Sequence, residues 1–179
     1  SETALHKEKE IAMIALQIKD VKHFMGRLLG TDLLDSFLLE EAVVSTYNTF
    51  TIDGRMNRAF FSREEWEEPS IRPYDFSPWK SMRPILFELI RGRKTPVSFR
   101  FTLHLMPQYV PGILKPSETT VTADQVKALV LTCRYENGTL TLLTGTSLHT
   151  FLPDKSADVL WDRTVKAFLN KREVGYDEL

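Results

Sequence analysis

An Asn-Gly pair between two β-rich runs constrains the fold of this chain more than any other feature of its sequence. The runs 127–135 and 139–144 are rich in Leu, Val and Thr, and they flank Asn137 and Gly138. Asn-Gly favours a type I′ hairpin turn because both central residues must tolerate a positive φ. The expected pairs are Tyr135 with Leu140, Cys133 with Leu142, Leu131 with Thr144, Arg134 with Thr141 and Thr132 with Leu143. A slip by one residue would exchange the apolar and polar faces of this hairpin.

Apolar periodicity predicts two helices and one further strand. A stripe at helical spacing follows Asp20, a good N-cap, and ends at Gly30. Residues 97–106 alternate strictly between apolar and polar types, which indicates a strand with one face in the core. A last helical stripe follows Asp154 or Ser156 and predicts a C-terminal helix.

A second hairpin is expected between residues 37 and 61. The run 37–50 is rich in Val, Thr, Tyr and Phe, and Asp53-Gly54 then provides a turn signal before the run 55–61. The alternation here is poorer than in the first hairpin, so both faces could be covered or a bulge could intervene.

Proline decides where the central helix is expected to begin. Ser77-Pro78 resembles an N-cap followed by proline at the first helical position, but Pro84 would then lie in the helix interior, where proline costs about 3 kcal/mol. An N-cap at Ser81 places Pro84 in the first turn, whose N–H groups have no helical partner. We therefore expect the helix to follow Ser81 and to end at Gly92.

The segment 107–121 is expected to be irregular. Prolines at 107, 111 and 116 make it too punctuated for a helix or a central strand, and it is longer than most connections. Such loops are often lids or disordered. Thr122 and Gln125 then fit a capping box that opens a helical turn.

These elements together predict an α+β fold. Their order is helix, hairpin, helix, strand, hairpin, helix, which favours a mainly antiparallel sheet built from two hairpins plus one strand, with three main helices packed on it. The doubly wound nucleotide-binding pattern is not indicated. We expect residues 13–179 to form a single domain and residues 1–12 to form a flexible tail.

Charge, cysteine content and missing motifs exclude several classes of protein. The 23 basic and 24 acidic residues nearly cancel, which argues against nucleic acid as a general partner. The single cysteine, Cys133, precludes an internal disulfide and cysteine-rich zinc sites. No apolar run approaches the roughly 20 residues that span a bilayer, and no secretion segment opens the chain, so we expect a cytoplasmic protein without a membrane partner. No metal site and no cofactor is predicted, and a protein partner or a homo-oligomer stays open.

A polar sheet face is the first candidate site. His104 falls on the polar side of its strand together with Arg100 and Thr102, and His149 shares a side of its own strand with Ser147. If the two strands are neighbours, imidazoles, a guanidinium and hydroxyls line one surface, which suits acid–base chemistry or anion binding. The alternative is a solvent-exposed sheet face with no site.

A basic segment is the second candidate. Between residues 79 and 100, six cations oppose only Glu88, and aromatic residues are interleaved. Its candidate phosphate- or nucleic-acid-binding residues are Lys80, Arg83, Arg91, Arg93 and Lys94. Arginine with aromatics can bind phosphates or single-stranded bases, but cations at a helix C-terminus are also favourable for structural reasons alone.

Two stretches of the sequence resemble an uncharacterised bacterial family, a domain of unknown function. The resemblance rests on residues 37–54 and 77–96, above all on Trp-Lys-Ser-Met-Arg-Pro and Gly-Arg-Lys-Thr-Pro, and it extends over most of the chain from Met13 onward. It implies no activity and no site residue. The missing catalytic motifs favour a binding or interaction module, with a small hydrolase-like enzyme that uses His104 and His149 as the alternative and phosphate or nucleic-acid binding as a third.

Overall fold

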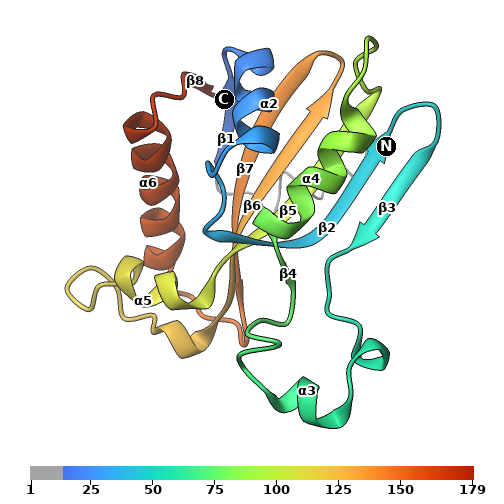
Figure 1. The fold of residues 1–179 in the computed structure, drawn as a ribbon. Coiled ribbons are helices and arrows are strands. Elements are labelled where there is room, and N and C mark those ends of the chain that lie inside the picture. The colour runs from blue at the N-terminus through green and yellow to red at the C-terminus, as the bar shows by residue number, and fades with distance from the viewer. Residues whose placement is uncertain (1–13) are drawn as a thin grey trace.

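One antiparallel sheet of eight strands organises residues 14–179, the part of the chain that the computed structural model describes (Figure 1). The strands are β1 (Ala15–Ile18), β2 (Phe37–Ser45), β3 (Thr49–Asp53), β4 (Ser77–Pro78), β5 (Ser98–Leu105), β6 (Val126–Glu136), β7 (Thr139–Leu148) and β8 (Tyr176–Glu178). Their order across the sheet is β3-β2-β5-β6-β7-β1-β8, and β4 pairs with β2. The tail expected at residues 1–12 lies outside the described residues.

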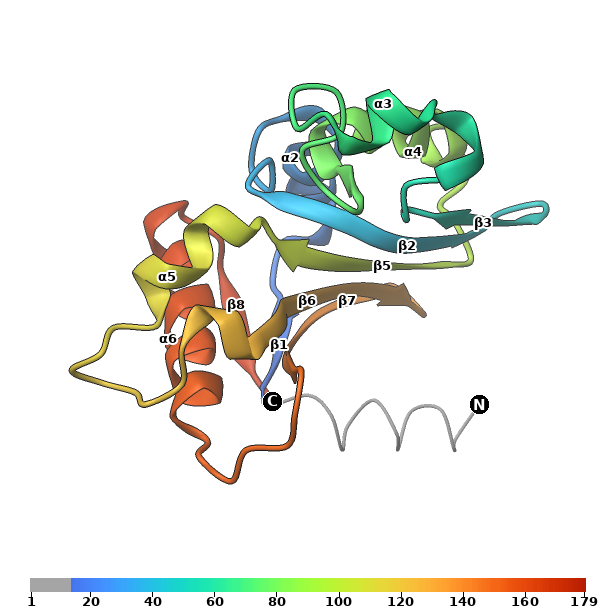
Figure 2. The same ribbon diagram turned by 90° about the horizontal axis from the view of Figure 1, so that it is seen from below.

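Three longer helices cover one face of this sheet. The α-helices are α2 (Val21–Gly30), α3 (Arg63–Glu67), α4 (Trp79–Ile90), α5 (Val110–Ile113) and α6 (Ser156–Lys171), and the three longer ones are α2, α4 and α6. Figure 2 shows α2 and α4 against β2 and β5, with α6 to one side of them. The core between these helices and the sheet is apolar, and Leu39, Phe101, Leu103 and Leu129 have no exposed surface. The predicted α+β class with an antiparallel sheet is confirmed.

The β6–β7 hairpin has the predicted turn and the predicted register. Asn137 and Gly138 adopt φ values of 53° and 76°, as a type I′ turn requires. Cys133 pairs with Leu142, and the other four expected pairs are also present. Both members of the Cys133–Leu142 pair are buried under the helices.

The predicted N-cap and end of α2 and the alternation of β5 are also confirmed, whereas the N-cap of α6 is Lys155, which lies between the two predicted residues Asp154 and Ser156. The Asp20 carboxylate accepts the His23 N–H at 3.1 Å and caps α2. Asp154 accepts the N–H of Ser156, the first residue of α6, at 2.8 Å. In β5, buried and partly exposed residues alternate without a break.

A hairpin forms in this region, but the predicted turn at Asp53-Gly54 and the predicted second strand at residues 55–61 were wrong: both strands, β2 and β3, lie within residues 37–53, and a 3₁₀ turn occupies Arg58–Phe60. The chain turns at residues 46–48, where the Thr46 N–H donates to the Asn48 carbonyl at 2.9 Å. Gly54 instead follows the end of β3 and lies against the β2 backbone, where an added Cβ would come within 1.8 Å of the Leu39 carbonyl oxygen. Glycine is needed here for close approach of two backbones and not for a turn.

The central helix begins earlier than expected. α4 starts at Trp79, so Pro84 is its sixth residue and the Lys80 carbonyl receives no helical hydrogen bond from position 84. Trp79 provides the compensation. Its side chain has no exposed surface, lies 5.3 Å from the Phe101 ring and donates from Nε1 to the Leu28 carbonyl at 3.3 Å. Tertiary packing therefore outweighs the proline cost.

The sheet is larger than two hairpins and one strand because three short strands join it. β1 pairs with β7 and β8, and β4 pairs with β2, each through three residue pairs or fewer. The segment 107–121 is also more regular than expected, with a 3₁₀ turn followed by α5. Val110, Leu114 and Val121 anchor this segment in the core.

Candidate functional site

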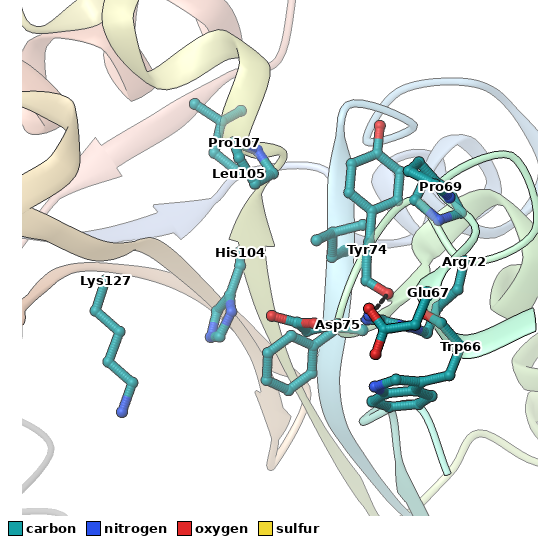
Figure 3. Close-up of a pocket in the computed structure, with 13 residues that line it drawn as sticks. Trp66, Glu67, Pro69, Arg72, Tyr74, Asp75, His104, Leu105, Pro107 and Lys127 are labelled. Carbon is teal, nitrogen blue, oxygen red and sulfur yellow. Dashed lines mark hydrogen bonds and ion pairs between the residues drawn. The ribbon is translucent and has the colours of Figure 1, made fainter. Parts of the chain in front are cut away.

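A cavity of about 340 Å³ lies on the sheet face that bears His104, away from the three longer helices. Its floor is the paired Leu38 and His104 of β2 and β5. Its outer wall comes from residues 55–76, which we call the excursion because they leave the sheet after β3 and return at β4. Figure 3 shows His104 and Lys127 on one side of this His104 cavity and side chains of the excursion on the other.

The excursion is tied to the sheet where it leaves and where it returns. Gly54 donates its N–H to the Glu40 carbonyl and accepts the Ser77 N–H, both at 2.8 Å. A β-bridge joins Arg55 to Phe76 just beyond this point. Backbone hydrogen bonds therefore hold the excursion, which forms the cavity wall, at both of its ends.

Inside the excursion, one tryptophan and two arginines replace a conventional core. The Arg72 guanidinium lies 3.8 Å from the centre of the Trp66 ring, and Arg58 lies 5.2 Å from it. Arg72 also donates to the Trp66 carbonyl at 2.9 Å and to the Asp75 carboxylate at 2.8 Å. Cation–π contacts and charge-assisted hydrogen bonds make this short segment rigid.

A β-bulge in β2 gives His104 a carboxylate partner. The register with β5 shifts between Leu39 and Glu41, so Glu40 is an extra residue with no partner across the ladder. Two buried residues, Leu39 and Ala42, face the helices, while Glu40 and Glu41 both reach groups on the opposite face. The bulge thus places two successive carboxylates on the polar side of the sheet.

Glu40 holds the His104 imidazole by one ring nitrogen. The Glu40 Oε2 atom lies 2.8 Å from His104 Nε2, and the His104 side chain is only 14% exposed. The hydrogen bond from His104 lowers the pKa of Glu40, and the positive charges of Lys127 and Arg55 contribute to the same shift. An ionised Glu40 accepts a hydrogen bond from Nε2–H, and in the tautomer that carries its proton on Nε2 the lone pair of the imidazole lies on Nδ1. Within residues 14–179, Nδ1 has no hydrogen-bond partner.

A second bulge positions Lys127, an exposed residue, at the edge of the cavity. The β6–β7 register shifts between Val126 and Ala128, so Lys127 is the extra residue. Its ammonium group makes no ion pair with any of the described side chains, although its charge acts on Glu40. The opposite wall presents the Glu67 and Asp75 carboxylates (Figure 3). The cavity therefore has a lysine at one edge, and Glu67 with the Arg72–Asp75 ion pair on the other side.

The aromatic side chains of Phe76 and Tyr74 complete the walls. The Phe76 ring lies 5.0 Å from the His104 ring in an edge-to-face arrangement. Gln108 donates to the Tyr74 hydroxyl at 2.6 Å, and that hydroxyl lies 3.5 Å from the Met106 sulfur. These contacts join the excursion to the end of β5 and restrict the orientation of the imidazole.

Only one member of the predicted His104 site lies in the cavity. Arg100 is on the same face of β5, where it pairs with Glu41 at 3.4 Å, and Thr102 lies between Arg100 and His104. Ser147 is near the end of β7, and His149 is exposed just beyond it. Across the sheet, His104 pairs with Val130 of β6, and Val130 pairs with Gly145 of β7. His149 is therefore two strands away from His104, about 10 Å across the sheet, and four residues beyond Gly145, about 13 Å along the strand direction.

The basic segment does not present one continuous surface of unengaged charges. Arg83 makes a bidentate ion pair with Asp35, at 3.0 and 3.1 Å, and these hydrogen bonds raise the pKa of Arg83. Arg91 pairs with Glu88 at 2.8 Å. The remaining members, Lys80, Arg93 and Lys94, are exposed on α4 and in the loop that follows it.

Several cavity residues were not identified from the sequence. Glu40 and Lys127 come from separate strands, Glu67, Tyr74 and Asp75 come from the excursion, and the bulges that orient the first two leave no clear mark on an alternating pattern. The one available signal was the adjacent pair Glu40-Glu41 inside a β-rich run, which is where the bulge lies.

The described residues offer no ready metal site and no membrane span. Within residues 14–179, no three His, Cys, Asp or Glu side chains are grouped so that they could hold a metal ion. No helix in the same range is long and apolar enough to cross a membrane. Cys133 is buried, and burial raises the pKa of its thiol, which is typical of a small core residue.

A family model matches almost the whole described region. Its description is "Family of unknown function (DUF5721)", and it covers residues 27–177. The chain belongs to this family, which confirms the resemblance to a domain of unknown function. Comparison with curated proteins and with solved structures found no match.

Proposed function

We propose that this chain is a ligand-binding module and that the His104 cavity is its binding site. The observation that carries the proposal is the Glu40–His104 pair, which fixes an imidazole on the wall of a cavity with Nδ1 left for another partner. The cavity's volume of about 340 Å³ lies within the range of small-molecule sites. Its location on a rigid sheet, with a wall tied down at both ends, supports a preformed site.

The charges around the cavity favour a small dipolar ligand. Lys127 suits an anionic group of the ligand, and His104 Nδ1 accepts a hydrogen bond from a neighbouring donor group. Glu67 on the opposite wall favours a second donor or a cationic group, while Asp75 beside it is paired with Arg72. Phe76 and Leu38 provide apolar surface between the two sides. Amino acids and other compact zwitterions have this distribution of groups.

Replacing His104 by alanine is expected to weaken binding of such a ligand at least tenfold, or about 1.4 kcal/mol. A thermal-shift panel of amino acids, small carboxylates and phosphates identifies the ligand, and isothermal titration calorimetry measures its affinity. His149→Ala is the matched control, because His149 is exposed and lies outside the cavity, and its affinity should equal that of the wild type. A panel without a stabilising compound, or equal affinities of wild type and His104→Ala, would contradict the proposal.

General acid–base catalysis at the same cavity is the second candidate function. It is favoured by the carboxylate–imidazole arrangement, in which Glu40 is a positioning residue and Nδ1 is the basic atom. Here Glu40, and not His149, is the partner of His104. NMR time courses of the bound compound separate the two functions. An unchanged compound supports binding alone, whereas a product that forms with wild type but not with His104→Ala supports catalysis.

The location of the protein is a proposal of the same kind. We propose that it acts in the cytoplasm, which is supported by a single cysteine that is buried as a free thiol.

A further inference from the structure

A second cavity, of about 200 Å³, lies on the other side of the sheet, between the strands and helices α2 and α6. Leu131 and Leu142 of the β6–β7 hairpin form part of its floor, Phe24 of α2 contributes one wall, and Trp161 and Val165 of α6 contribute another. We call it the apolar cavity. No charged side chain lines it, in contrast to the His104 cavity.

Two of the polar side chains that line the apolar cavity, Trp161 and Thr164, are already engaged, and the Ser36 and Tyr109 hydroxyls are the other polar side-chain groups of its lining. Trp161 donates from Nε1 to the Val130 carbonyl at 2.8 Å, and the Thr164 hydroxyl donates to the Leu160 carbonyl at 2.7 Å. A buried water needs two to four polar partners, and cavities lined by aliphatic and aromatic side chains stay dry. The space is therefore poorly suited to water and well suited to an apolar guest.

The apolar cavity is buried at its inner end and reaches the protein surface at its edge. Its inner residues are almost completely buried, with Phe24, Leu131 and Trp161 each 2% exposed. Tyr109, which is 49% exposed, lies at its edge with Ile113 and marks a route to solvent. An apolar cavity of about 150 Å³ is known to take up benzene, so this larger one has room for one or two fused rings.

We propose that the apolar cavity is a binding site for a small uncharged aromatic molecule. This inference is separate from the His104 site, because it depends on different side chains and on the opposite face of the sheet. A charged group on the guest is excluded, since an ion buried here would have no partner.

Benzene and benzoate form a matched pair of probes, because they differ only in a carboxylate. Benzene is expected to shift the ¹³C-methyl NMR signals of Leu131, Leu142 and Val165, and to leave those of Leu86, a buried residue of α4, in place. Benzoate at the same concentration should shift none of them. The inference would be overturned if benzene moved no cavity methyl, if it moved Leu86 as strongly, or if benzoate acted equally.

A cavity-filling variant provides the second test. Val165→Phe places a ring in the cavity, and we expect it to weaken benzene binding at least tenfold. Ile85→Phe is the matched control, since it makes a similar change on a helix at a side chain that is 50% exposed, and it should bind benzene like the wild type. Undiminished binding by a folded Val165→Phe protein would refute the assignment. If that variant does not fold, the methyl shifts of the wild type decide.

Discussion

Replacing Gly54 by alanine is expected to destabilise the protein by about 3 kcal/mol, at the upper end of what overpacking costs. The added Cβ would lie 1.8 Å from the Leu39 carbonyl oxygen and 3.1 Å from that of Glu40, so backbone would have to move. The segment that must move is the bulge that turns Glu40 toward His104. Urea unfolding followed by circular dichroism measures the loss of stability.

Gly26→Ala is the matched control for this substitution. Gly26 lies inside α2, and nothing is within 4 Å of the position of an added Cβ. Alanine is favoured over glycine in a helix interior, so this variant should be more stable than the wild type by about 0.5–1 kcal/mol. Gly54→Ala and Gly26→Ala proteins of equal stability would show that Gly54 does not lie against β2.

Replacing Trp79 by alanine is expected to lower the free energy of unfolding by about 3–5 kcal/mol. The side chain has no exposed surface, and its removal leaves a cavity beside Phe101 and an unsatisfied Leu28 carbonyl. A domain with total stability of about 5–15 kcal/mol would then retain only part of its stability. Chemical denaturation of purified protein gives the value directly.

Two further variants separate the contributions of Trp79. Trp79→Phe keeps most of the ring and removes the Nε1 donor, so its loss should be clearly smaller than that of the alanine variant. Phe87→Ala changes the same helix at a side chain that is 44% exposed, and it should cost less than Trp79→Ala by several-fold. A Trp79→Ala protein that unfolds at the wild-type urea midpoint would contradict the assigned position of α4.

The elements that could be predicted from the sequence are those whose determinants are local. Asn137-Gly138 prescribes its own turn, and that turn prescribes the pairing of Cys133 with Leu142. Asp20 likewise marks the start of α2. Short strands such as β1 and β8 carry too few residues for a pattern, and they form because distant segments supply their partners.

Two of the local predictions failed because a distant contact competes with the local signal. Asp53-Gly54 has the composition of a turn, yet Gly54 serves the close approach of the excursion to β2. Pro84 argues for a late start of α4, yet burial of Trp79 extends the helix toward its N-terminus. Neither contact can be read from neighbouring residues.

The candidate site was only partly predictable for a related reason. Alternation along β5 correctly placed His104 on the polar face, because a regular strand needs no other information. Glu40 and Lys127 reach this region through bulges, which depend on the pairing of two strands and not on either sequence alone. His149, by contrast, was grouped with His104 because alternation puts it on the same side of its strand as Ser147. Alternation does not give the distance of His149 from His104 along the direction of β7.

The central claim is that the bulge in β2 holds the ionised Glu40 carboxylate against His104. Because the pKa of Glu40 is lowered in the folded protein, the pair stabilises the fold above the ordinary pKa of glutamate, and this contribution is lost as the pH falls through the lower folded value. The most direct test is an NMR pH titration of the Glu40 side-chain ¹³C carboxyl signal in wild type and in His104→Ala. We predict a midpoint below the usual glutamate range in the wild type and a higher midpoint in the variant. An ordinary midpoint in the wild type, unchanged in His104→Ala, would contradict the account.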